Sequence, residues 1–263
     1  MNIDDTNNLT ASRRLLILVR ADGVETLVGS SDADEWHRGE IAVNVPGVSA
    51  PVKTLEEAVY TSPGLLADYS DVDVVADSKS FVIVPSEIAG DSDLVCKVVS
   101  RLWPDRSGDE VIVDNCGSVV FLTLFDKSLV GFVNRTFVRS SLHGRMAMLT
   151  SFFMSLSAPV NRVKLYVRFD GSSRVDIVAL TSDSLLMANS FECDSIDDAV
   201  YFIMTCVKDC GFDELDDEML LCGDADRCAA VTDILRQYIN SVMPLLIPAP
   251  DINIALELLY LKK

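Results

Sequence analysis

Residues 163–192 read VKLYVRFDGSSRVDIVALTSDSLLMANSFE, and this stretch decides the fold. It holds three apolar, β-branched runs, which are separated by Asp170-Gly171 and by Ser182-Asp183-Ser184. Asp-Gly is typical of tight hairpin turns, because these turns need positive φ and glycine adopts it without steric cost. The stretch therefore predicts three consecutive antiparallel strands.

The next segment changes from a period of two to a period of 3.6. Asp194 or Ser195 is placed to cap a helix, and Gly211 to end it, because glycine is favoured just past a helix C-terminus. A short buried strand over 218–222 and a helix over 226–241 follow. Strand–strand–strand–helix–strand–helix is the order of a ribonuclease H-like unit, in which helices flank a mixed sheet.

The first part of the chain holds a looser version of the same order. LVRADG at 18–23 and YVRFDG at 166–171 share Val-Arg, one spacer residue and Asp-Gly, and a β-rich segment follows each. This echo indicates a duplication, and two such halves in tandem form the actin-like ATPase fold. We therefore predict an α/β protein (mixed α+β) with halves at 1–115 and 116–263, the boundary lying between 105 and 160.

Three further elements are expected in the first half. The segment around Asp22-Gly23 indicates a hairpin. Val72–Ala76 and Phe81–Val84 are β-branched runs on either side of a polar tripeptide, which predicts a second hairpin. A long amphipathic helix is expected from about Leu142 to Leu156.

The chain is strongly acidic. Lys and Arg total 22 against 40 Asp and Glu, which gives a net charge of −18. Such a field repels nucleic acid phosphates and anionic lipid head groups. No apolar run approaches the roughly 20 residues of a membrane helix, and the N-terminal residues lack the layout of a signal peptide. Seven irregularly spaced cysteines are typical of reduced thiols. These features predict a cytoplasmic protein that binds neither nucleic acid nor membranes.

Four segments carry the pattern of a known family: FVIVPSE at 81–87, LMANSF at 186–191, DAVYF at 198–202 and LLCG at 220–223. In these segments the chain resembles domain-of-unknown-function family 3822, a family of uncharacterised bacterial proteins. The resemblance spans nearly the whole chain. It implies a duplicated actin-like ATPase (ribonuclease H-like) fold, with no established activity, substrate or cofactor.

The same resemblance implies where a nucleotide would bind. Active actin-like ATPases hold phosphate at the first hairpin of each half, which here gives Asp22-Gly23 and Asp170-Gly171-Ser172-Ser173 as candidates. Phosphate binding needs an acid for Mg²⁺ or water, a glycine for close approach and hydroxyl donors. Asp-Gly also makes a tight turn that requires no ligand. Because Val24-Glu25 brings an apolar group and a negative charge to the first copy, we interpret both segments as turns.

Adenosine is usually bound in this fold at a glycine-rich turn from strand to helix. The matching turn is Cys222-Gly223-Asp224-Ala225-Asp226, with Gly223 as its one glycine. Active members tend to carry paired glycines there. Carboxylates at 224 and 226 suit helix capping and the helix dipole rather than a bound polyphosphate.

The sequence also contains candidate residues for two other kinds of site. A ribonuclease H-like nuclease would need clustered carboxylates, and Asp170 and Asp224 are candidates if they converge at one sheet edge. Cys206 and Cys210 fall on the apolar face of the predicted helix, where cysteine packs as a small hydrophobe. The two histidines have no nucleophile motif beside them, so a catalytic triad is not indicated. No catalytic residue and no metal site are predicted.

The leading hypothesis is a non-catalytic scaffold or adaptor of actin-like fold with eroded nucleotide loops, which needs no cofactor and binds a protein partner. The first alternative is an ATP-binding enzyme of the actin-like ATPase superfamily. That alternative would use Asp22, Gly23, Asp170, Gly171, Ser172, Ser173 and Gly223. The second alternative is a metal-dependent nuclease of ribonuclease H-like type. The leading hypothesis predicts that the chain is not an enzyme, whereas both alternatives predict that it is one.

Overall fold

The computed structural model describes residues 13–20, 22–30, 35–43, 50–157, 162–171, 173–182, 184–247 and 254–262. These residues form two compact units. The described residues up to Leu149 and those from residue 254 onward make the first unit, and the described residues from Thr150 to 247 make the second.

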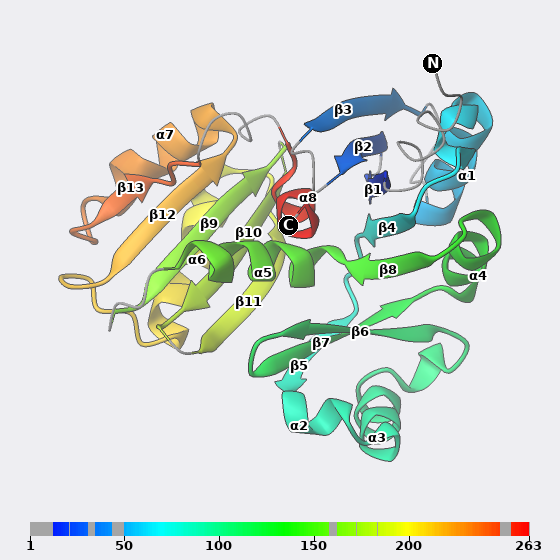
Figure 1. Cartoon of the computed structure of the whole chain (residues 1–263). Coiled ribbons are helices and arrows are strands. Elements are labelled where there is room, and N and C mark those ends of the chain that lie inside the picture. The colour runs from blue at the N-terminus through cyan, green and yellow to red at the C-terminus, as the bar shows by residue number, and fades with distance from the viewer. Residues whose placement is uncertain are drawn as a thin grey trace. The chain divides into compact units, whose positions relative to one another are not determined.

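The first unit contains two sheets and the helices around them (Figure 1). Its elements are β1 (Arg14–Val19), β2 (Gly23–Ser30), β3 (Glu35–Ala42), α1 (Pro51–Thr61), β4 (Asp71–Ala76), β5 (Phe81–Pro85), α2 (Ser86–Ala89), α3 (Ser92–Leu102), β6 (Glu110–Cys116), β7 (Val119–Phe125), α4 (Lys127–Thr136), β8 (Ser140–Gly144), the start of α5 (Arg145–Leu156) and α8 (Leu256–Leu261). Short 3₁₀ turns lie at Pro63–Leu66 and Pro104–Arg106.

The larger sheet of this unit has the order β3-β2-β1-β4-β8. Strands β1 to β3 pair antiparallel, and β4 is parallel to both β1 and β8. Alternate residues of β1, among them Leu15 and Ile17, are fully buried in a core that α1 and α4 complete with Leu55 and Val133. The hairpin expected around Asp22-Gly23 is confirmed as β1–β2.

The smaller sheet has the order β5-β7-β6 and is wholly antiparallel. The predicted hairpin of 72–76 with 81–84 is therefore wrong, because β4 pairs in the large sheet and β5 pairs with β7. The polar linker does not turn back. Instead Ser78 donates its hydroxyl to the Leu124 carbonyl at 2.7 Å, and Leu124 N–H donates to the Ser80 carbonyl at 2.9 Å. These hydrogen bonds fix the linker to β7, so the chain continues from the large sheet into the small one.

The second unit is built on one sheet, with the order β11-β10-β9-β12-β13. Its elements are the end of α5, β9 (Lys164–Asp170), β10 (Arg174–Leu180), β11 (Leu185–Glu192), α6 (Ile196–Asp209), β12 (Glu218–Gly223), α7 (Ala225–Leu235) and β13 (Val242–Pro244). The order strand–strand–strand–helix–strand–helix predicted for this region is confirmed.

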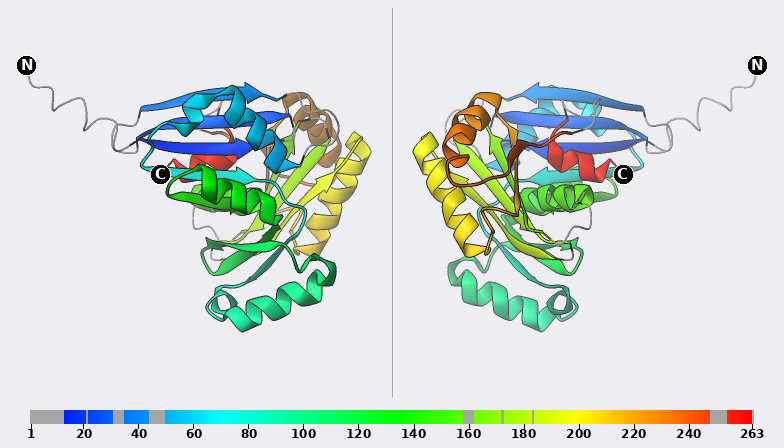
Figure 2. Two further views of the ribbon diagram at one scale, coloured as in Figure 1. Left: turned by 90° about the vertical axis from the view of Figure 1, so that its right-hand side faces the viewer. Right: turned by 90° about the vertical axis from the view of Figure 1, so that its left-hand side faces the viewer.

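The helices of the second unit lie on opposite faces of that sheet (Figure 2). Helices α6 and α7 bury Ile203 and Val231 against the face that carries Val167 and Ile177. On the other face, the end of α5 stacks Phe153 on Tyr166 with ring centroids 4.6 Å apart.

Local sequence explains where α6 begins and ends. Ser195 is its N-cap, and its hydroxyl accepts the Asp198 N–H at 3.1 Å. Gly211 follows the C-cap with φ +68°, a conformation that favours glycine. Phe212 N–H then reaches back to the Val207 carbonyl at 3.1 Å, which completes a Schellman motif. The sequence predicted both ends of this helix.

The two five-stranded sheets share one strand order and one pattern of parallel and antiparallel pairing, as a duplication requires. The chain passes from the first sheet to the second between Gly144 and Lys164, later than residue 116. The sequence boundary of the duplicated halves stays a prediction.

Helix α5 begins at Arg145 rather than near Leu142, because Leu142 is a residue of β8 that pairs with Val74. None of the described helices has the length and apolar character needed to cross a bilayer.

Candidate functional site

The turn between β1 and β2 carries Asp22 and Gly23 and is bonded to the protein itself. Arg20 N–H donates to the Gly23 carbonyl at 2.8 Å, and Val43 N–H donates to the Asp22 carbonyl at 3.0 Å. Gly23 lies outside the positive-φ region, so the turn type expected from the sequence is wrong here. The glycine is needed because a Cβ would lie 2.5 Å from the Ile41 carbonyl oxygen of β3.

A cavity of about 200 Å³ lies beside this turn. Its lining residues are Arg20, Asp22, Gly23, Val24, Glu25, Glu40, Ile41 and Ala42. Three of them are acidic and one is basic, so the charge of the lining disfavours a polyphosphate. Glu25 is 4% exposed. Its carboxylate pairs with Nε of Arg38 at 3.0 Å and accepts the Ala255 N–H at 3.0 Å.

The turn between β9 and β10 carries the second set of candidates. Gly171 has φ +62° with open space around it, as a tight Asp-Gly turn requires. Arg227 of α7 donates to the Gly171 carbonyl at 3.1 Å and to the Arg174 carbonyl at 3.2 Å. The Asp170 carboxylate lies 3.3 Å from the guanidinium of Arg168. Ser173 accepts the Cys193 N–H at its carbonyl, and Ser172 lies outside the described residues.

Gly223 sits where β12 turns into α7. Its φ is +98°, and a Cβ there would lie 2.0 Å from the Phe169 carbonyl oxygen of β9. Asp224 N–H donates to the same oxygen at 3.1 Å, and the Asp224 side chain accepts the Arg227 N–H at 2.9 Å as the N-cap of α7. The glycine is therefore explained by strand packing. The helix N-terminus, which binds anions in nucleotide-binding folds, already holds a carboxylate.

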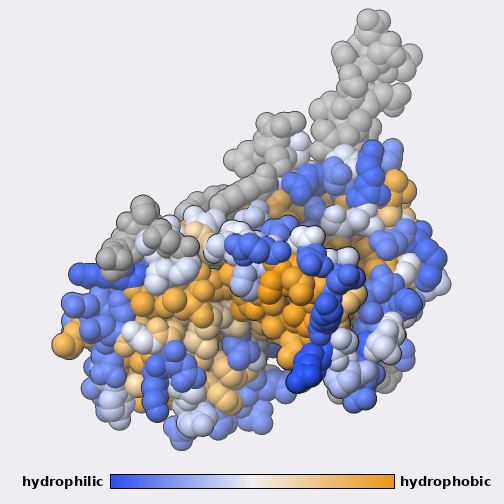
Figure 3. Space-filling view, turned by 90° about the horizontal axis from the view of Figure 1, so that it is seen from below, coloured by the Kyte–Doolittle hydropathy of each residue, from blue (hydrophilic) through white to orange (hydrophobic). Residues whose placement is uncertain are grey.

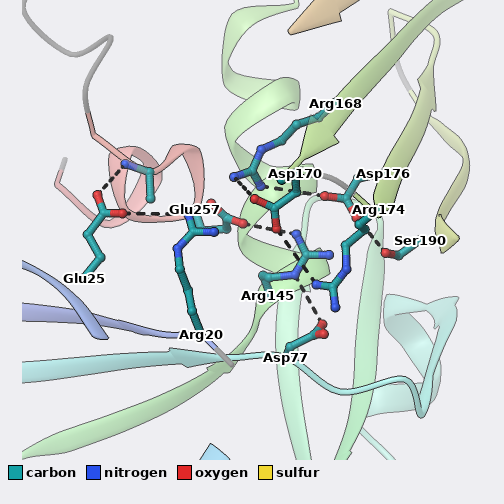
Figure 4. Close-up of polar contacts among 12 residues, drawn as sticks. Arg20, Glu25, Asp77, Arg145, Arg168, Asp170, Arg174, Asp176, Ser190 and Glu257 are labelled. Carbon is teal, nitrogen blue, oxygen red and sulfur yellow. Dashed lines mark hydrogen bonds and ion pairs between the residues drawn. The ribbon is translucent and has the colours of Figure 1, made fainter. Parts of the chain in front are cut away.

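Charged residues follow the carboxyl ends of three neighbouring parallel strands in the first unit (Figure 4). Arg20 follows β1, Asp77 follows β4 and Arg145 follows β8. Arg145 is 4% exposed, and its guanidinium lies 3.2 Å from Asp77 and 3.2 Å from Glu257 of α8. These contacts were not predicted from the sequence. Their signal was a charged residue directly after each of three apolar strands.

A comparable cluster lies in the second unit, where Arg168 and Asp176 are opposite each other on β9 and β10 (Figure 4). Asp176 is fully buried. Its carboxylate accepts the Ser190 hydroxyl at 2.7 Å and lies 3.7 Å from the Arg168 guanidinium. Buried charges need such partners, because an isolated charge in a protein interior is costly.

A third polar group, His143, bridges the two sheets of the first unit. Its Nδ1 lies 2.7 Å from Asp114 of β6 and its Nε2 lies 3.3 Å from Asp73 of β4. Burial alone would lower the pKa of His143, but the hydrogen bonds to both carboxylates raise it to about 9. Burial would also raise the pKa of Asp73, yet its hydrogen bonds to His143 and Arg14 keep that pKa below its usual value.

The cysteines and the candidate carboxylates have other roles in the part of the chain that the structure describes. Among the described residues there is no group of three or more His, Cys, Asp or Glu side chains placed to hold a metal ion. Cys206 lies in the core of the second unit, and burial, with smaller contributions from Cys210 and Asp209, raises the pKa of its thiol to about 12. Asp170 and Asp224 are engaged by arginine and by the α7 N-terminus, respectively.

The sequence model of a family described as "Protein of unknown function (DUF3822)" matches residues 5–242. The chain belongs to this family. No curated protein matches the sequence. The crystal structure of a Bacteroides thetaiotaomicron protein with actin-like ATPase fold and unknown function is 23% identical, covers 100% of this chain and 99% of its own, and has a TM-score of 0.83. The predicted α/β class and the predicted actin-like ATPase fold are confirmed.

More distant likenesses concern shape alone. The cytoplasmic domain of EpsL, an inner membrane component of the type II secretion system of Vibrio cholerae, is 10% identical, with a TM-score of 0.48 over 81% of this chain and 82% of that one. The ROK hexokinase from Thermus thermophilus is 8% identical, with a TM-score of 0.42 over 94% of this chain and 98% of that one.

Proposed function

We propose that this member of the family is a non-catalytic scaffold or adaptor that works through protein contacts. The proposal rests on one observation: α8 packs against β1 and β4, and its Glu257 is ion-paired with Arg145, the first residue after β8. In open α/β sheets, ligands bind in the crevice outside the carboxyl ends of the strands. In the first unit, Arg145 at the carboxyl end of β8 is already engaged by Glu257 of α8.

The contacts that hold α8 there are buried and charged. Glu257 is fully buried against Arg145, and Glu25 accepts the first N–H of the segment at Ala255. Leu256, Leu258 and Leu259 are buried beside them, and α8 packs against β1 and β4. Removing one partner of a buried ion pair costs on the order of 3–5 kcal/mol. A nucleotide would therefore have to displace a segment that the unit's own buried charges retain.

The second unit supports the same proposal. Its helix N-terminus at α7 is capped by Asp224, and Asp226 adds a second acid in the first turn. Both acids disfavour an approaching polyphosphate. The glycines at 171 and 223 are explained by a turn and by the Phe169 carbonyl, so neither requires a ligand.

Thermal stability with and without Mg-ATP tests the proposal. A ligand at a hundred times its dissociation constant, bound only to the folded state, adds about 2.7 kcal/mol. For a chain of this size that raises the melting temperature by roughly 2–4 °C per kcal/mol. Millimolar Mg-ATP thus reveals a site of about 10 μM affinity, and we expect no shift beyond that given by Mg²⁺ alone.

A shift of several degrees with Mg-ATP, lost in Asp22→Asn or Asp170→Asn, overturns the scaffold proposal and restores the ATP-binding enzyme. Stabilisation by Mn²⁺ or Mg²⁺ together with cleavage of single-stranded or duplex nucleic acid restores the metal-dependent nuclease. Inorganic phosphate and ADP serve as ligand controls, because they separate a phosphate site from an adenosine site.

Two further features belong to the proposal. We infer that the role is cytoplasmic, because all seven cysteines are free thiols, including Cys96, which is exposed. We also infer that each five-stranded sheet descends from one ribonuclease H-like half, on the strength of the shared strand order. We expect the partner to be a protein. An affinity pull-down from native lysate, with the wild-type chain as bait, would identify it.

A further inference from the structure

Helix α3 has an apolar face that its own unit does not cover. Its eleven residues include Leu94, Val95, Val98, Val99 and Leu102, yet none of its residues is buried. Val95, Val98 and Val99 are partly buried against a small core of Val84, Val120 and Leu122. Leu94 remains 41% exposed and Leu102 50% exposed.

The two exposed leucines belong to one row. Leu94, Val98 and Leu102 are spaced by four residues, so they lie along one side of the helix. Val113 of β6, on the same sheet face as Leu122, is 42% exposed and extends the apolar area over the sheet. Figure 3 views the molecule from the side on which α2 and α3 lie in Figure 1, and shows apolar side chains at the surface with hydrophilic ones around them.

The charges beside this row have an unusual arrangement for a chain of net charge −18. Asp91 and Asp93 lie at the N-terminal end of α3, and Lys97 and Arg101 follow one and two turns later. Among the described residues, neither Lys97 nor Arg101 forms an ion pair. The two acidic and two basic residues cancel, so the helix and its cap have no net charge. Helix α3 is thus locally neutral in a strongly acidic chain.

We propose that α3 pairs antiparallel with α3 of a second copy of this chain. With the two-fold axis level with Lys97, Asp93 of one copy and Arg101 of the other are each four residues from the axis, about 6 Å along the helix. Asp93 of one copy therefore lies beside Arg101 of the other. The two-fold axis repeats this contact, so two such ion pairs form across the interface. Leu94 and Leu102 of both copies form the apolar contact between the two helices, which we call the seam.

The expected strength follows from size and charge. A helix of eleven residues is about 16 Å long, so the pair buries less than the roughly 1,200 Å² of a standard stable interface. The two Lys97 side chains meet at the axis, which costs affinity, although their flexible stems can point apart. We expect a dissociation constant on the order of 10–100 μM, so the dimer is visible only at high concentration.

Sedimentation equilibrium of the full chain from about 5 μM to 500 μM, a range set by the expected affinity, tests this proposal. Wild type should show a reversible monomer–dimer equilibrium. Leu94→Glu should weaken it at least tenfold, because it places an uncompensated charge in the apolar seam. The matched control is Leu66→Glu, the same change at a leucine that is 53% exposed on the 3₁₀ turn Pro63–Leu66, and it should leave the equilibrium unchanged.

Charge reversal tests the antiparallel register. Asp93→Lys and Arg101→Glu should each weaken dimerisation several-fold, and the double variant should restore it, because both pairs are then reversed. All the substituted side chains are exposed, so circular dichroism should show an unchanged fold. A wild type that stays monomeric throughout the range overturns the proposal. So does a dimer that Leu94→Glu leaves intact, and a double variant that fails to recover overturns the antiparallel pairing.

Discussion

Nδ1 of His143 lies 2.7 Å from Oδ1 of Asp114, and this contact joins the edge strand of the large sheet to the small sheet of the first unit. The second oxygen of Asp114 accepts the Gly144 N–H at 2.8 Å, so both oxygens are engaged by β8. On its other side the imidazole reaches Asp73, which Arg14 holds at 2.8 Å. This network therefore links β8, β6, β4 and β1 through one charged histidine.

This histidine predicts a pH dependence of stability. Its pKa is raised to about 9 in the folded chain, against 6.5 for the ordinary group. A raised pKa stabilises fully below the unfolded value, so the contribution is present below pH 6.5 and is lost between pH 6.5 and 9. The shift corresponds to at most roughly 3–4 kcal/mol. Urea unfolding at pH 6, 7.5 and 9 should show the free energy of unfolding falling with pH.

The variant His143→Gln provides the control. Glutamine can form hydrogen bonds but does not titrate. The free energy of unfolding of this variant should therefore fall much less between pH 6 and 9. Equal slopes for wild type and variant would contradict the assignment. Asp73 acts in the opposite direction, because its lowered pKa gives stability that is lost only in acid, below its usual value of 3.8.

Arg227 is predicted to hold the β9–β10 turn. Besides its two carbonyl contacts, its guanidinium lies 2.9 Å from the Cys193 sulfur and 4.8 Å from the centre of the Phe169 ring. Arg227→Gln should lower the free energy of unfolding by about 2 kcal/mol, since several hydrogen bonds and a cation–π contact are lost together. Arg227→Lys should recover part of this, because an ammonium keeps the charge but not the planar fork. Chemical unfolding measures both. A neutral Arg227→Gln would mean that the turn is closed without it.

The fold was largely predictable where local signals agreed. In α6 the period of 3.6, the Ser195 cap and Gly211 at the C-terminus all indicate one helix, and the structure has it. The wrong hairpin between β4 and β5 had the opposite cause. Two β-branched runs around a polar tripeptide fit a hairpin locally, but the pairing partners, β1 and β7, are distant in sequence. No local pattern carries that information.

The candidate site was predictable only in part. Asp170-Gly171 forms a tight turn, as its composition indicates. Gly23 and Gly223, by contrast, are glycines because the Ile41 and Phe169 carbonyls approach them from other strands. The cluster of Arg145 with Glu257 joins residues 112 positions apart, so only the folded chain reveals it.

The glycines give a matched set of predictions. Gly223→Ala places a Cβ 2.0 Å from the Phe169 carbonyl oxygen at φ +98°, so both a clash and backbone strain arise. We expect a loss of more than about 3 kcal/mol, or failure to fold. Gly171→Ala meets open space at φ +62° and should cost only about 1 kcal/mol. Thermal unfolding of both variants measures the difference. Equal losses would show that strand packing is not what requires glycine at 223.

The two hairpin aspartates should behave differently when each is changed to asparagine. Asn-Gly makes the same turn as Asp-Gly, so Asp22→Asn, at an exposed side chain, should change stability by less than about 0.5 kcal/mol. Asp170 is different because its carboxylate is 16% exposed and pairs with Arg168 and Arg174 at 3.3 and 4.0 Å. Asp170→Asn leaves Arg168, itself 5% exposed, with less of its compensating charge. We expect it to cost about 1–3 kcal/mol.

Chemical unfolding at low and high salt separates these effects. The cost of Asp170→Asn should persist in 0.5 M salt, a concentration chosen so that the Debye length of a few ångströms screens exposed pairs and not buried ones. Double substitution of Asp170→Asn with Arg168→Met should cost less than the sum of the single changes, since the arginine left behind is then removed as well. Additive losses would mean that Asp170 serves something other than this ion pair. Its carboxylate would then again be a candidate for the metal or phosphate role that the scaffold proposal denies it.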